Sequence, residues 1–141
     1  MSRSIRFSLT LLAAAIGLTA MAGGSALALA AADASNTGGI PPDNSFLEGS
    51  PFASYLIPGL LLAVVVGGLH LLAAFLVGRG SQFGPLAATI AAFGLLIWIF
   101  VQMVFIPFSP LQAIYFVAGL GELGFVLLIL GVLHHPELNR L

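Results

Sequence analysis

The sequence predicts an all-α membrane protein: four antiparallel transmembrane helices packed as one bundle, in a single domain that spans residues 1–141. Composition is the first observation behind this prediction. Hydrophobic residues make up 60% of the chain and charged residues only 6%, and the mean hydropathy is +1.13. Because a soluble domain has about a quarter of its residues charged, this chain cannot face water over its whole surface. Four long apolar stretches and a one-sided distribution of arginines are the other two observations.

The apolar stretches have the length of membrane spans and lie at about residues 7–32, 54–77, 86–106 and 111–133. An α-helix needs about 20 apolar residues to cross a hydrocarbon core of roughly 30 Å. Backbone groups in lipid must bond within their own segment, and no stretch has the alternation of a barrel strand, so we expect helices. The short second and third connections make consecutive helices antiparallel neighbours.

Prolines and glycines mark the expected helix ends. Pro51, Pro85 and Pro110 are expected to open the second, third and fourth spans, since the first helical position needs no N–H. Pro58 lies inside the second stretch and predicts a kink or a later helix start. Residues expected to close the spans are Gly78, Pro107, His134, His135 and Pro136.

The arginines predict the orientation. With four spans, the N-terminus, the second connection and the C-terminus lie on the same side of the membrane. All basic residues lie in these three segments: Arg3, Arg6, Arg79 and Arg140. The polar loop 33–50 contains Asp33, Asp43 and Glu48 and no basic residue. By the positive-inside rule, both termini are cytoplasmic and the 33–50 loop is extracytoplasmic.

The first apolar stretch has two interpretations. Two arginines, an apolar run and the alanine-rich segment 26–32 are typical of a cleaved signal peptide, which would leave three spans. The run is nevertheless longer than the roughly 7–15 apolar residues of a signal. Small residues also recur on one helical face, a pattern that favours close packing of a retained helix. These residues are Ala13, Gly17, Ala20, Gly24 and Ala28.

Four polar residues inside the spans form the candidate intramembrane cluster: Glu122, His70, Gln102 and Tyr115. An ionisable group at mid-bilayer costs roughly 2.5–3.5 kcal/mol on insertion scales and therefore normally faces protein or water. Helical phase directs all four toward the bundle interior, with Gln102 and Tyr115 about 10 Å nearer the outside than the midplane. Each also has a structural interpretation, since a buried hydrogen bond between helices needs no function.

Several classes of chemistry are excluded or unsupported. The chain has no cysteine, which rules out disulfides, thiolate metal sites and thiol redox chemistry. His134 and His135 are adjacent but have no third ligand, so we expect no metal site there and a helix-end role instead. No cofactor-binding motif is present, and a net charge of −1 implies no nucleic-acid partner.

Segments 49–59 (GSPFASYLIPG), 96–102 (LIWIFVQ) and 111–112 (LQ) resemble a group of uncharacterised, hypothetical four-span membrane proteins of high-GC bacteria. The resemblance covers about residues 47–125 and implies four spans in a bacterial plasma (inner) membrane. It implies no activity. In size the chain is also similar to small multidrug-resistance transporters, but those have a membrane glutamate in the first span, where this chain has no acid.

Three functions follow as hypotheses. The first is a non-enzymatic bundle that contacts lipid or quinone, or that serves as an accessory partner in a homodimer or a larger membrane complex. The second is a small proton-coupled transporter with Glu122 as the carrier. The third, an enzyme with a His70–Glu122 acid–base pair, has the least support because no nucleophile, metal cluster or cofactor anchor accompanies the pair.

Overall fold

The computed structural model describes residues 3–32 and 44–132, and within these ranges every regular element is helical. Among the described residues, four helices are long and apolar enough to cross a membrane. They are α1 (Arg3–Ala32), the continuous helix Leu56–Gly78, α4 (Gly84–Phe105) and α5 (Pro110–Ile129). A short 3₁₀ helix, η1 (Asn44–Leu47), lies in the first loop. The prediction of an all-α chain with four span-length helices is therefore confirmed.

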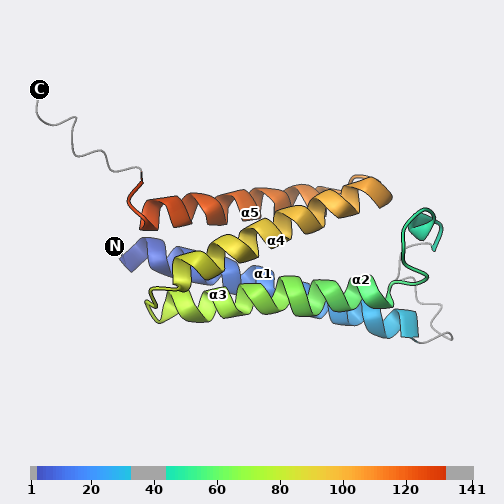
Figure 1. Ribbon diagram of the computed structural model, residues 1–141, viewed down its shortest axis with the longest axis horizontal. Coiled ribbons are helices and arrows are strands. Elements are labelled where there is room, and N and C mark those ends of the chain that lie inside the picture. The colour runs from blue at the N-terminus through green and yellow to red at the C-terminus, as the bar shows by residue number, and fades with distance from the viewer. Residues whose placement is uncertain (1–2, 33–43, 133–141) are drawn as a thin grey trace, which may run out of the picture.

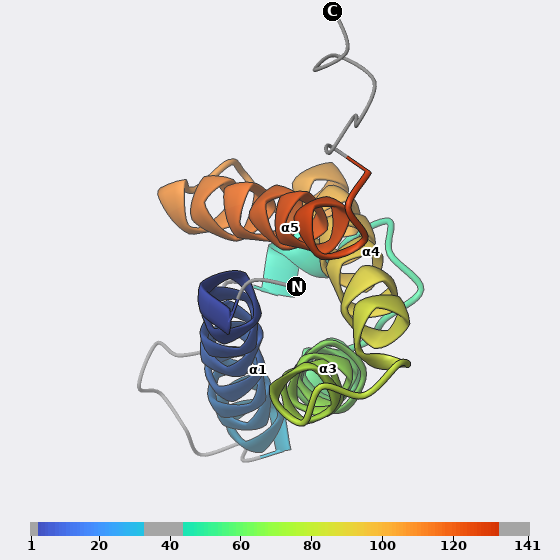
Figure 2. The same cartoon turned by 90° about the vertical axis from the view of Figure 1, so that its left-hand side faces the viewer.

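The long helices lie along one common axis. Figure 1 shows α1 running away from the end marked N, the next helix returning, α4 running away and α5 returning. Seen from that end, α1, α3, α4 and α5 follow one another around a ring (Figure 2), which closes because α1 contacts α5 as well as α3. The α3–α4 turn therefore lies beside the N-terminus, and the η1 loop and the α4–α5 turn lie at the opposite end.

The second long helix has three segments and starts later than Pro51, where we expected it to open. These segments are α2 (Leu56–Leu60), the π-helical η2 (Leu61–Gly67) and α3 (Gly68–Gly78). Pro58 lies in the first turn, where backbone N–H groups have no partner within the helix. The proline therefore sets a later start, which was one of its two expected outcomes.

Two glycines in the left-handed region end α3 and α5. Gly80 has φ +68 and Gly131 has φ +70. After α5, the Gly131 N–H donates to the Leu128 carbonyl and the Val132 N–H to the Leu127 carbonyl, the bonding pattern of a Schellman cap. The fourth helix therefore ends at Ile129, short of residue 133, and Gly131 stops it ahead of His134–Pro136, which lie outside the described residues.

A capping box opens α5. The Ser109 side-chain oxygen accepts a hydrogen bond from the Gln112 backbone N–H, and the Gln112 side-chain oxygen accepts one from the Ser109 backbone N–H. Two N–H groups that the helix itself leaves unpaired are thereby bonded. Pro110 follows at the start of the helix, as its position in the sequence predicted.

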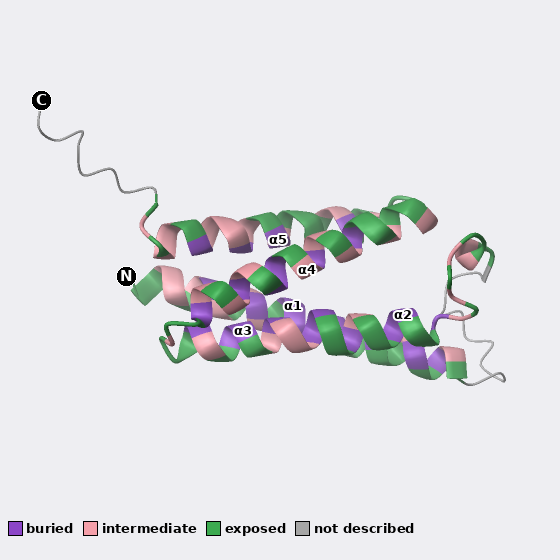
Figure 3. Cartoon of the chain, viewed as in Figure 1, coloured by how far each residue is buried: buried purple, intermediate pink, exposed green. Residues whose placement is uncertain are grey.

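Small residues let the backbone of α1 approach the backbone of the second long helix closely. All five residues of the predicted small-residue face on α1 are buried. At Gly24 an added Cβ would lie 2.5 Å from both the Ala63 amide nitrogen and the Gly59 carbonyl oxygen. No side chain fits there, so the glycine itself allows this approach. In Figure 3 the buried residues line the inner faces of the helices, and the exposed ones, many of them large and apolar, face outward.

Candidate functional site

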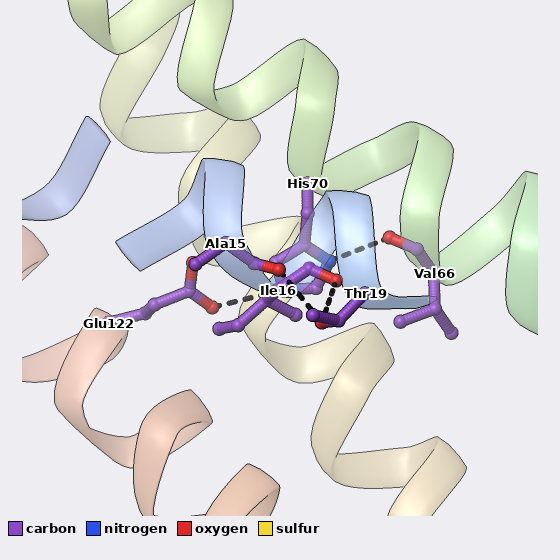
Figure 4. A network of polar contacts seen from close by, with 6 residues as sticks. All are labelled: Ala15, Ile16, Thr19, Val66, His70 and Glu122. Carbon is purple, nitrogen blue, oxygen red and sulfur yellow. Dashed lines mark hydrogen bonds and ion pairs between the residues drawn. The ribbon is translucent and has the colours of Figure 1, made fainter. Parts of the chain in front are cut away.

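His70 and Glu122 form a bonded pair at the centre of the bundle. The His70 Nε2 atom lies 3.0 Å from Glu122 Oε2, and both side chains are 0% exposed. His70 belongs to α3 and Glu122 to α5, helices that lie on opposite sides of the ring in Figure 2. The bond therefore joins two helices that are not neighbours in the ring, and α1 passes beside it (Figure 4).

The second ring nitrogen determines where hydrogens lie in this pair. His70 Nδ1 is 2.7 Å from the carbonyl oxygen of Val66, a residue in the last turn of η2. A carbonyl oxygen only accepts, so Nδ1 carries a hydrogen and donates it. Nε2 then either accepts a hydrogen from a protonated Glu122 or donates one to a carboxylate. The two forms differ by the position of one proton, and both have zero net charge.

Glu122 is bonded through only one of its two carboxyl oxygens within the described residues. Its Oε1 atom is buried and has no hydrogen-bond partner within the described parts of the chain. Buried polar atoms in native proteins nearly always have partners, so a lone exception calls for an explanation. Neither His70 nor Glu122 lines any of the cavities described below.

A second polar contact joins α1 to α5. The Tyr115 hydroxyl donates to Thr19 Oγ1 over 2.7 Å, and Thr19 donates to the Ala15 carbonyl oxygen at 2.8 Å. Thr19 was not among the residues that the sequence singled out. Because a threonine can bond within its own helix, its residue type alone did not predict a partner on another helix.

Two adjoining cavities lie near the η1 loop and the α4–α5 turn. The first, of about 210 Å³, is here called the α5 cavity, and Thr19, Gln102 and Tyr115 are among its lining residues. The second, of about 130 Å³, lies beneath the η1 loop and is here called the loop cavity. Three residues line both: Trp98, Gln102 and Ile106.

Gln102 is a polar residue of the wall that the two cavities share. Its side-chain amide makes no hydrogen bond to any described residue, although it borders both cavities. The four predicted residues thus separate into two sets. His70 and Glu122 bond each other in the closed centre, whereas Gln102 and Tyr115 border the α5 cavity.

A further polar side chain borders the α5 cavity. Gln112 is buried and also lines the α5 cavity, but its side chain is engaged in the capping box. His134 and His135 lie outside the described residues. Within those residues, no group of three or more histidine, cysteine, aspartate and glutamate side chains is placed to hold a metal ion.

Comparison of this chain with known protein families, with curated proteins and with solved structures finds no match. Its function must therefore be argued from the bonded pair and the two cavities.

Proposed function

We propose that this chain is a non-enzymatic, four-span protein of a bacterial plasma membrane that binds an uncharged part of a membrane lipid in the extracytoplasmic half of its bundle. Its bound partner is thus a component of the bilayer. This proposal includes the N-in, C-in orientation, an antiparallel four-span topology and retention of α1.

The observation that carries the proposal is the pair of adjoining cavities. The described residues that line them include no charged side chain and are mostly apolar, with Gln102 at the shared wall. Ligand sites typically combine an apolar lining with a few polar groups that orient the ligand. A hydrocarbon chain suits the apolar walls, and an ester or hydroxyl oxygen suits the Gln102 amide, which has no partner among the described residues.

The enzyme hypothesis has less support than lipid binding. The His70–Glu122 pair is fully enclosed and borders neither cavity, so a substrate bound in either cavity would not touch it. An acid–base pair must come within hydrogen-bonding reach of the proton that it moves.

A proton-coupled transporter is the second candidate function, and it is favoured by Glu122 Oε1, a buried atom with no partner in the described parts of the chain. A carrier of this kind needs a second conformation that opens the pair to each side of the membrane in turn. Glu122→Gln assayed for pH-gradient-driven flux in proteoliposomes tests this candidate, since a fully active variant would remove Glu122 as carrier.

The proposed orientation predicts which residues can be labelled from outside. The native chain has no cysteine, so Asn44→Cys introduces a single thiol in the η1 loop. In intact cells we expect a membrane-impermeant maleimide to label it, while a fluorescent reporter at the C-terminus folds in the cytoplasm. Labelling of position 44 only after cell lysis would contradict the orientation. N-terminal sequencing of the extracted protein tests retention of α1.

Filling the α5 cavity should displace a bound lipid. Gly23 lines this cavity, and an added Cβ there meets no atom within 4 Å, so Gly23→Phe places a ring in the cavity without a backbone clash. Native mass spectrometry of protein extracted in mild detergent should show at least one more retained lipid on the wild type than on Gly23→Phe.

Gly124→Phe is the matched control for the cavity-filling variant. Gly124 also has open space around an added Cβ, but it lies on α5 away from the cavity linings. We expect this variant to keep the lipid. Equal lipid retention by both phenylalanine variants would contradict binding in the α5 cavity.

A further inference from the structure

The end of the bundle opposite the two cavities has a basic cleft of about 290 Å³. Its lining residues are Arg3, Arg6, Phe7, Thr10 and Gly78. The first four come from the start of α1 and the last from the end of α3. Figure 1 shows these two helix ends at the same end of the molecule. The cleft therefore lies where two helices meet the proposed cytoplasmic surface.

Arg6 is held against the turn between α3 and α4. An added Cβ at Gly80 would lie 2.9 Å from Arg6 Nη1, so the guanidinium packs directly on this turn. The Thr10 hydroxyl donates to the Arg6 carbonyl oxygen at 2.8 Å within α1. The contact at Gly80 thus gives the Arg6 side chain a defined place in the cleft lining.

The positive charge of the cleft has no counter-charge in the structure as described. The described carboxylates are Glu48, in the loop at the far end, and Glu122, which bonds His70 at the centre. No arginine makes an ion pair with a described residue, and the side chains of Arg3 and Arg6 make no hydrogen bond to one. Each guanidinium has five N–H donors to offer a ligand.

We propose that this cleft binds the phosphate group of an anionic phospholipid in the cytoplasmic leaflet. Guanidinium groups match phosphate oxygens with paired hydrogen bonds, which an ammonium group cannot reproduce. Phe7, which is 68% exposed, lies beside the two arginines and offers its ring to an acyl chain. A soluble phosphate would use only the charges, whereas a lipid uses the charges and the ring together.

This site rests on the proposed membrane orientation but not on the α5 or loop cavity. The two ends of the bundle then differ in chemistry: the described residues make a mainly apolar binding site at one end and a cationic one at the other. Loss of lipid from the basic cleft leaves binding in the α5 cavity intact, so the two proposals fail independently.

The test uses Arg6→Lys in the full-length protein. Lysine keeps the positive charge that sets the membrane orientation, but it lacks the planar guanidinium group whose N–H donors bond phosphate in pairs. Native mass spectrometry in detergent would measure binding of phosphatidylglycerol and of phosphatidylcholine with the same acyl chains. The wild type should prefer phosphatidylglycerol, and Arg6→Lys should bind it about tenfold more weakly, the loss expected for one charge-assisted hydrogen bond. Binding of phosphatidylglycerol that is unchanged by Arg6→Lys would overturn the proposal.

Arg79 supplies the matched control. It lies at the same end and has the same charge, but its guanidinium stands 4.5 Å above the Phe75 ring and does not line the cleft. Arg79→Lys should bind phosphatidylglycerol as the wild type does. An equal loss in both lysine variants would show a diffuse surface effect and overturn the site. Inorganic phosphate that binds as tightly as phosphatidylglycerol would instead identify soluble phosphate as the ligand and overturn the assignment to lipid.

Discussion

Gly24→Val should lower the free energy of unfolding by about 1–3 kcal/mol, the range typical of overpacked cores. The reason is the backbone contact between α1 and the second long helix. A Cβ at position 24 would lie 2.5 Å from backbone atoms of Ala63 and Gly59, and backbone cannot rotate away as a side chain can. The helices must separate, and the buried contacts along their shared face would weaken together. Steric trapping in detergent or bicelles measures the change.

Gly23→Val is the control for this prediction, because it makes the same substitution one residue earlier on the same helix. An added Cβ at Gly23 meets no atom within 4 Å. We expect its effect to stay within about 0.5 kcal/mol, as for substitutions away from close contacts. Equal stability of the two valine variants would show that α1 does not approach the second helix this closely.

His70→Leu should lower the stability by about 1–3 kcal/mol, because it leaves the Glu122 carboxyl group buried without its bonded partner. Oε2 loses its bond to Nε2, and Oε1 has no partner within the described residues to begin with. Glu122→Leu should cost less, about 1 kcal/mol, in the range of transmembrane hydrogen bonds. Replacing both residues by leucine should recover part of the loss, because no polar side chain of the pair then stays buried and unpaired.

Glu122→Gln separates a hydrogen bond from an ion pair. The glutamine amide can donate to His70 Nε2, since Nδ1 already donates to the Val66 carbonyl oxygen. We therefore expect nearly wild-type thermal stability, measured in the same detergent as the leucine variants. A loss as large as that of His70→Leu would contradict this expectation and show that charge holds the two side chains together.

The sequence by itself determined the class of the fold. Low charge and four apolar stretches require helices whose backbone groups bond internally, and the structure has four such helices among its described residues. The small-residue face of α1 could also be predicted, because its residues repeat at helical spacing and all five are buried. These properties depend on composition and helical period, which can be read along a single helix.

Helix ends depended on local backbone geometry that the sequence indicated less well. Gly131 ends α5 through its left-handed conformation, whereas His134, His135 and Pro136 beyond it suggested a later end. Nothing in the sequence signalled the π-helical segment Leu61–Gly67. Its last turn nevertheless supplies the Val66 carbonyl that fixes the His70 ring.

Only the tertiary structure decided how the polar residues combine. Helical phase directed all four candidates inward, but the partner of each depends on how four helices are rotated and shifted relative to one another. That arrangement bonds His70 to Glu122 across the ring, gives Tyr115 a partner in Thr19, and leaves the Gln102 amide at the wall of two cavities. A helix specifies which side chains share a face, whereas contacts between helices that are not neighbours in the ring arise only when the whole bundle is packed.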